Sequence, residues 1–229
     1  MSDALAVLSP HLDDAVFGCG ERLAVCAGAT VVTVFAGRPP ASMPLTEWDA
    51  AAGFREGDDV VGARRAEDAS ALALLGAAPV WLDFLDAQYA ATPEVSTLSA
   101  ALAMALATLA PATVLIPLGL FHSDHALVHE AALTCARRAD GRRWLAYEEP
   151  MYRRLPEARA RRFAALRAAG IAVEREPPVT PEPPATPRAL ELKRRAVLCY
   201  RSQLRALDSA GRPGWHDALE EERYWRVLV

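Results

Sequence analysis

Residues 4–36 read ALAVLSPHLDDAVFGCGERLAVCAGATVVTVFA, and this stretch decides the fold class. Residues 4–9 are an apolar run typical of a buried strand, and residues 30–36 form a second, β-branched run. Between them, residues 15–27 carry a helical pattern that Gly28 closes. A strand, a helix and a strand in succession predict a right-handed crossover between parallel strands.

The same alternation continues to about residue 150. Further strands are expected at residues 80–84, 113–117 and 144–147, and further helices at residues 58–75, 95–109 and 123–138. This order predicts an α/β fold with a mainly parallel sheet that is covered by helices on both faces. A length of 229 residues is tight for two domains, so we expect a single domain over residues 1–229.

Four other segments complete the prediction. Residues 37–57 form a long loop with three prolines, and loops of this length inside a domain are usually functional or disordered. Residues 177–187, PPVTPEPPATP, are expected to form an exposed connector, because proline cannot continue a helix or a central strand. A helix is expected at residues 188–207, and an edge strand within residues 220–229.

Composition excludes several classes of protein. The net charge of −4 argues against a nucleic-acid partner, since such domains usually carry a basic surplus. The apolar stretch 97–118 is alanine-rich and interrupted by Pro111, so we expect no membrane span. The N-terminus lacks the basic segment of a signal peptide, and no two of the four cysteines form a CxxC pair. We therefore expect a cytoplasmic protein with its cysteines buried as small apolar residues.

Two polar clusters follow strands of the predicted sheet. Ser9-Pro10-His11-Leu12-Asp13-Asp14 comes after the first strand, and His122-Ser123-Asp124-His125 comes after the fourth. In an open α/β sheet, ligand sites lie at the carboxyl ends of the strands, and the first and fourth strands are neighbours where the strand order reverses. We therefore expect the two clusters to meet in one site, although Asp13 and Asp14 could also serve only as helix caps.

Two histidines and one aspartate make a nitrogen and oxygen ligand set that suits Zn²⁺. Three protein ligands with a fourth, open position are typical of a catalytic site. A remaining carboxylate can take a proton from water, and a remaining imidazole can stabilise an oxyanion. His129 lies one turn beyond His125, where it could be a ligand, but a packing role is favoured.

Together, the two clusters resemble the metal motifs of the PIG-L/LmbE family of zinc-dependent N-acetylglucosaminyl deacetylases. Further similarities lie at Arg64 to Glu67, Leu75-Gly76, Asp86, Tyr147 to Tyr152, and Lys193 with Tyr200 to Gln203. The resemblance implies a Rossmann-like three-layer sandwich with its metal site at the C-terminal ends of the strands. It departs from the commonest motifs at Leu12, Ala15 and Ser123, and it offers only Phe121 where the family often has an aromatic gate.

Residue roles are implied by this resemblance. Zinc ligation falls to His11, Asp14 and His125, the general base to Asp13, and polarisation of the carbonyl to His122. Arg64 and Asp86 would hold substrate hydroxyls or a phosphate, although Arg64 could equally be a solvated charge on a helix face that pairs with Glu67 or Asp68. Trp48, in the long loop, is expected either to form part of a sugar-binding wall or to anchor the loop by its own burial.

The leading hypothesis is a zinc hydrolase that removes an acetyl group from an N-acetylated sugar or sugar conjugate. One alternative is a nucleotide- or phospho-sugar-binding protein without hydrolysis, in which Gly18-Cys19-Gly20 would be a phosphate loop. A second alternative is a metal-dependent esterase or de-N-acylase that acts on a substrate other than a sugar. The sequence leaves the oligomeric state open, a homo-oligomer included.

Overall fold

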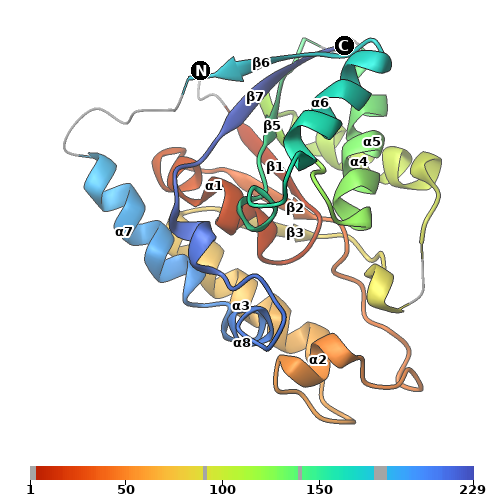
Figure 1. The fold of residues 1–229 in the computed structure, drawn as a ribbon, viewed down its shortest axis with the longest axis vertical. Coiled ribbons are helices and arrows are strands. Elements are labelled where there is room, and N and C mark those ends of the chain that lie inside the picture. The colour runs from red at the N-terminus through yellow and green to blue at the C-terminus, as the bar shows by residue number, and fades with distance from the viewer. Residues whose placement is uncertain (1–3, 90–91, 139–140, 178–184) are drawn as a thin grey trace.

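The computed structural model describes residues 4–89, 92–138, 141–177 and 185–229. One seven-stranded sheet runs through the molecule in the order β3-β2-β1-β4-β5-β7-β6 (Figure 1). The strands are β1 (Leu5–Ser9), β2 (Thr30–Thr33), β3 (Ala78–Trp81), β4 (Thr113–Pro117), β5 (Arg143–Tyr147), β6 (Ala172–Glu176) and β7 (Tyr224–Leu228). β1 to β5 are parallel, whereas β7 runs antiparallel to both of its neighbours.

Helices cover both faces of the sheet. They are α1 (Asp14–Val25), α2 (Glu47–Ala51), α3 (Val60–Leu75), α4 (Val95–Leu109), α5 (Ser123–Ala136), α6 (Ala158–Ala168), α7 (Ala185–Val197) and α8 (Arg201–Leu207). Side chains alternate along a strand, so Val7 of β1 packs with α1, α3 and α7, whereas Ala6 and Leu8 pack with α4 and α5. The predicted α/β fold with three layers is confirmed (Figure 1).

β1 lies at the point where the strand order reverses. Its register pairs Val7 with Val31 of β2 on one side and with Leu115 of β4 on the other. The segments that follow β1 and β4 therefore emerge side by side at the carboxyl edge of the sheet, as the sequence predicted. This arrangement brings residues 11–14 and residues 122–125 into one place.

The C-terminal half differs from the sequence prediction. α6 and β6 were not predicted, because α6 is rich in arginine, β6 ends in Glu-Arg-Glu, and both lack a strong apolar period. β7 is not an edge strand, since β6 pairs along its outer side. The helix expected at residues 188–207 is two helices, and at the break Tyr200 is fully buried and donates its hydroxyl to Asp68 Oδ1 at 2.8 Å.

Two smaller predictions also need revision. The loop at residues 37–57 contains the short helix α2, which Thr46 caps through a hydrogen bond from the Asp49 amide. Most of the connector predicted at residues 177–187 lies outside the described residues, and Ala185 already belongs to α7. Cys19 and Cys135 are buried as expected, whereas Cys26 and Cys199 are half-buried. Across the part of the chain that the structure describes, every helix is too short or too polar to cross a membrane.

Gly18 and Gly20 allow α1 to approach its neighbours closely. A Cβ atom at Gly18 would lie 2.6 Å from Cδ2 of Tyr147, and one at Gly20 would lie 2.7 Å from Cγ of Lys193. Both glycines are buried inside a regular helix. Because neighbouring side chains cover them, the alternative that residues 18–20 form a phosphate loop is wrong.

Lys193 makes this packing rigid. Its side chain is fully buried, and its Nζ lies 2.8 Å from Glu222 Oε1. The same carboxylate accepts hydrogen bonds from the backbone amides of Glu21 and Arg22, so it ties α7, α1 and the segment before β7 together. A buried ion pair of this kind tolerates little displacement of either partner.

We expect Gly20→Ala to lower the free energy of unfolding by about 1–3 kcal/mol, because the new methyl group overpacks against Lys193. Helix propensity alone predicts the opposite sign, since alanine is about 1 kcal/mol better than glycine inside a helix. Urea unfolding of the variant and the wild type measures the difference. A variant that is more stable than the wild type would contradict the packing argument.

Candidate metal centre and cavity

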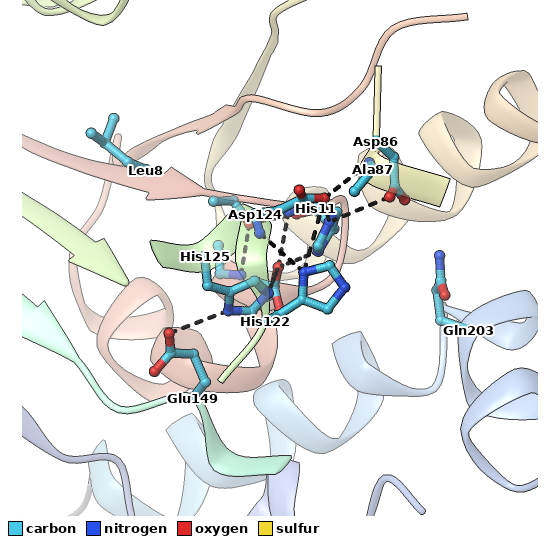
Figure 2. A network of polar contacts seen from close by, with 12 residues as sticks. Leu8, His11, Asp86, Ala87, His122, Asp124, His125, Glu149 and Gln203 are labelled. Carbon is cyan, nitrogen blue, oxygen red and sulfur yellow. Dashed lines mark hydrogen bonds and ion pairs between the residues drawn. The ribbon is translucent and has the colours of Figure 1, made fainter. Parts of the chain in front are cut away.

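A cavity of about 820 Å³ opens at the carboxyl edge of the sheet. Both clusters identified in the sequence contribute to its lining, and so do Asp86 and Trp48. The lining residues that the sequence predicted are His11, Asp13, Asp14, Trp48, Asp86, His122 and His125. Figure 2 shows His11, His122, Asp124 and His125 converging, although more than a hundred residues separate the two clusters.

His11 follows the end of β1 and lies between two carboxylates. Its Nδ1 is 3.1 Å from Asp14 Oδ2, and its Nε2 is 3.0 Å from Asp124 Oδ2. The backbone amide of His11 also donates to Asp14 Oδ2 at 2.9 Å, which fixes that carboxylate at the start of α1. Asp124 is held in turn by the backbone amide of Ala87.

His125 lies in the first turn of α5 and is fully buried. Its Nε2 is 3.1 Å from Asp14 Oδ2, the same oxygen atom that His11 approaches. Its Nδ1 is 3.2 Å from Glu149 Oε1, which also accepts the backbone amide of Gly119 at 2.6 Å (Figure 2). Glu149 was missed as a site residue, although its position just beyond the end of β5 could have indicated it.

The imidazoles of His11 and His125 have the same arrangement of carboxylates around them. Each has a carboxylate behind it, Asp124 for His11 and Glu149 for His125, and each turns its other nitrogen toward Asp14. A carboxylate behind an imidazole fixes the tautomer and makes the opposite nitrogen a better metal ligand. Ligand atoms of His11, Asp14 and His125 all lie within 4.8 Å of one another, so these residues fit a metal ion.

A second group of residues is less suited to a metal. His11, His122 and Asp124 also lie within 4.8 Å of one another. However, Nδ1 of His122 already accepts the Asp124 amide at 3.2 Å, where it caps α5. Oδ2 of Asp124 already accepts from Ala87 and contacts His11. These atoms hold the local backbone in place. In the first group only Asp14 Oδ2 has such a role, because it accepts the His11 amide, whereas the nitrogens of His11 and His125 that face it contact side-chain atoms.

The electrostatics of the cluster favour a positive charge at its centre. Burial lowers the pKa of His125, but the carboxylates of Asp14 and Glu149 outweigh it and raise this pKa to about 9. Burial raises the pKa of Asp14, but the neighbouring imidazoles outweigh it and hold this pKa well below its usual range. The carboxylates therefore attract either protons on the imidazoles or a cation between them.

Asp13 and Asp14 differ in environment although they are adjacent. Asp13 is buried beside Asp14 and lines the cavity. Burial and the charge of Asp14 raise the pKa of Asp13 to about 7. A carboxylate with a pKa near neutrality can accept and release a proton under ordinary conditions, as a general base requires.

His122 presents a defined tautomer to the cavity. Because Nδ1 accepts the Asp124 amide, the neutral ring carries its proton on Nε2. Burial, together with the charges of His11 and His125, lowers the pKa of His122 and so favours this neutral form. The ring is an N–H donor at the edge of the cluster.

Arg64 does not lie where the sequence placed it. It was expected either to contact substrate or to pair on the helix surface with Glu67 or Asp68, but it is 5% exposed and forms a buried ion pair with Asp49, Nη2 to Oδ1, at 2.8 Å. Asp49 also accepts the hydroxyl of Tyr89 at 3.0 Å. Arg64 therefore anchors the loop at residues 37–57, whereas Asp86 and Trp48 do reach the cavity.

The sequence matches the model of one protein family. The model for PIG-L, GlcNAc-PI de-N-acetylase, matches residues 6–136, which is more than half of the chain. The chain belongs to the PIG-L family. The match confirms the family resemblance that the two metal motifs indicated. A search of curated proteins found no match to this sequence.

Solved structures share the fold of this PIG-L family member. The A40926 pseudoaglycone deacetylase Dbv21 is 27% identical, with a TM-score of 0.75 over 100% of this chain and 98% of that one. The zinc inhibited form of teicoplanin deacetylase Orf2 is 24% identical, with a TM-score of 0.75 over 98% of each chain. The 4-carboxy-2-hydroxymuconate hydratase GalB from Pseudomonas putida KT2440 is 20% identical, with a TM-score of 0.59 over 100% and 95%.

His129 packs behind the site. It is fully buried, and its Nδ1 lies 2.7 Å from the carbonyl oxygen of Pro117, to which it donates. Burial and the charge of Arg162 lower its pKa to about 3. His129 therefore stays neutral in the folded PIG-L domain, and it belongs to neither group of metal-competent residues.

This neutrality makes stability depend on pH. Between pH 6.5 and 3 the unfolded chain binds a proton at His129 and the folded chain does not, so the free energy of unfolding falls as the pH falls. We expect His129→Asn, which retains a donor for Pro117, to be less stable than the wild type at pH 7. That difference should shrink by about 2 kcal/mol at pH 5. Urea unfolding of both proteins at the two pH values tests this, and a constant difference would refute it.

Proposed function

We propose that this protein is a zinc-dependent hydrolase that removes an N-acetyl group from an N-acetylated sugar or sugar conjugate. The observation that carries the proposal is the single oxygen of Asp14 between two imidazoles that are each backed by a carboxylate. This centre lies in a cavity large enough for a sugar, next to an aspartate with a pKa of about 7. A binding protein without hydrolysis has no need for this set of groups.

The family and one structural neighbour support this choice of reaction. The family is described as a de-N-acetylase, and the 27% identical neighbour is a deacetylase of a pseudoaglycone. The fold alone would not be sufficient support, because the structurally similar GalB is a hydratase. A cytoplasmic location, which the cysteine usage suggests, is part of the same proposal.

His11, Asp14 and His125 would hold the metal ion. Two nitrogen ligands and one oxygen ligand suit Zn²⁺ and leave a position for other ligands. When bound, such an ion polarises a carbonyl group and lowers the pKa of water to roughly 7. Asp124 and Glu149 hold the two imidazoles in the orientation that ligation needs.

Two further side chains complete the reaction. Asp13 accepts a proton from the attacking water and later returns it to the departing amine. The Nε2–H of His122 donates a hydrogen bond to the oxyanion that forms on the acetamide carbonyl. Asp86, whose carboxylate accepts from the Gln88 amide at 3.1 Å, is placed to bind a sugar hydroxyl. Acetate and a free amine are the products.

We expect chelator-treated protein to lose amine release from N-acetylglucosamine conjugates and to regain it with one equivalent of Zn²⁺.

Asp14→Ala and His125→Ala should each lose most bound zinc, because three protein ligands leave no redundancy. His216→Ala, which changes an exposed histidine outside the cavity, serves as the control. Metal analysis and a fluorescent amine assay measure both effects, and stoichiometric zinc in either ligand variant would overturn the ligand set.

The roles of the adjacent aspartates are separable. Asp13→Asn should retain its zinc and its fold but lose turnover by roughly 10²–10⁴, which is the contribution of a positioned general base. Asp83→Asn makes the same change at an exposed position and should retain full activity. Steady-state rates and zinc content are compared for all three proteins. Near-normal turnover of Asp13→Asn would refute the assignment of the base.

A further inference from the structure

Arg212 lies over Trp48 at the side of the cavity. Its Cζ is 5.1 Å from the centroid of the Trp48 ring, a distance at which a guanidinium is attracted by an indole face. Both side chains line the cavity, and Arg212 is exposed. The ring face that the sequence suggested as a sugar-binding wall therefore carries a cation.

Two sets of contacts fix this pair in place. Trp48 Nε1 donates to Gln203 Oε1 at 3.0 Å, which links α2 to α8, and the two helices pack together (Figure 1). The turn that carries Arg212 is closed by hydrogen bonds from its own amide to Ser209 O at 3.1 Å and from Gly214 N to Leu207 O at 3.0 Å. Arg212 therefore lies in a turn closed by backbone hydrogen bonds, and its guanidinium lies over an indole ring that Gln203 holds in place.

Arg212 is the only arginine or lysine among the described residues that line the cavity. The other ionisable side chains there are acids, histidines and a tyrosine. Across the described ranges, no carboxylate lies within ion-pair distance of Arg212, whereas Arg64 and Arg153 in the same part of the molecule have acidic partners. The guanidinium donors of Arg212 are therefore available to a ligand.

The pair is separate from the metal centre. Figure 2 shows Gln203, which holds Trp48, standing apart from the group of His11, His122 and His125. Even so, the Arg212–Trp48 pair and the metal centre line the same cavity. A substrate whose acetamide lies at the imidazoles would therefore bring a different part of itself to Arg212.

We propose that Arg212, held over Trp48, determines specificity by binding an anionic group, a carboxylate or a phosphate, on the part of the substrate that is not deacetylated. A planar guanidinium binds both anions through paired N–H donors. The inference rests on the proposed function for the identity of the substrate, but the anion site itself does not depend on turnover.

The test compares three substrates of the zinc-loaded enzyme: methyl N-acetylglucosaminide, N-acetylglucosamine 1-phosphate and N-acetylmuramic acid. The last two distinguish a phosphate from a carboxylate. We expect wild-type kcat/KM to be at least tenfold higher for one anionic compound than for the neutral one, which is the usual effect of a charge-assisted hydrogen bond. Arg212→Gln should abolish this ratio through KM, and the KM of the wild type for the anion should rise with salt.

Arg194→Gln is the matched control, because it removes the same charge from an exposed position on α7. It should preserve the anionic preference. Arg212→Lys should retain part of that preference, since it keeps the charge without the planar fork. Equal kcat/KM values for all three substrates, or an anionic preference that survives in Arg212→Gln, would overturn the proposal and would show that Arg212 only covers Trp48.

Calorimetric binding of the same three compounds separates this inference from the proposed function. If none is deacetylated, the proposed function fails. The anion site then still stands if the wild type binds an anionic compound at least tenfold more tightly than Arg212→Gln does. It falls if the two proteins bind that compound equally.

Discussion

One carboxylate oxygen sets the conditions for the whole site. Asp14 Oδ2 lies 3.1 Å from a nitrogen of His11 and 3.1 Å from a nitrogen of His125. His125 is buried and the other two groups are partly buried, so the carboxylate favours a positive charge among them, because unbalanced negative charge with limited access to water is costly. Asp124 and Glu149 add negative charge behind the imidazoles, so the site attracts either protons on the imidazoles or a cation between them.

The sheet supplies the geometry that this cluster needs. Asp14 begins the helix after β1, His125 lies in the helix after β4, and Glu149 follows β5. These three strands are consecutive in the sheet, so their carboxyl ends lie next to one another. The proposed ligands and Glu149 are thus placed by strand pairing and helix starts, which are rigid, and the segment that carries Trp48 supplies one wall of the cavity.

The centre of the site is more predictable from the sequence than its surroundings are. The strand at residues 4–9, the helix at residues 95–109 and the clusters around His11 and His125 carry strong local patterns, and these predict their own place in the fold. Arg64 and Glu149 carry no such pattern, because their roles depend on residues that are distant in the sequence. Asp49 pairs with Arg64, and the Gly119 amide orients Glu149. β6 was missed because an edge strand of alternating charges needs little apolar surface.

The position of β7 has a consequence for how the chain is made. β6 pairs with β7 alone, and β7 closes the open side of β5. While residues 224–228 are still inside the ribosome, the emerging chain carries β5 as an uncovered edge and β6 without a partner. The sheet can therefore be completed only after synthesis has passed residue 228, and until then β5 is an additional open edge at which the nascent protein can pair with another chain.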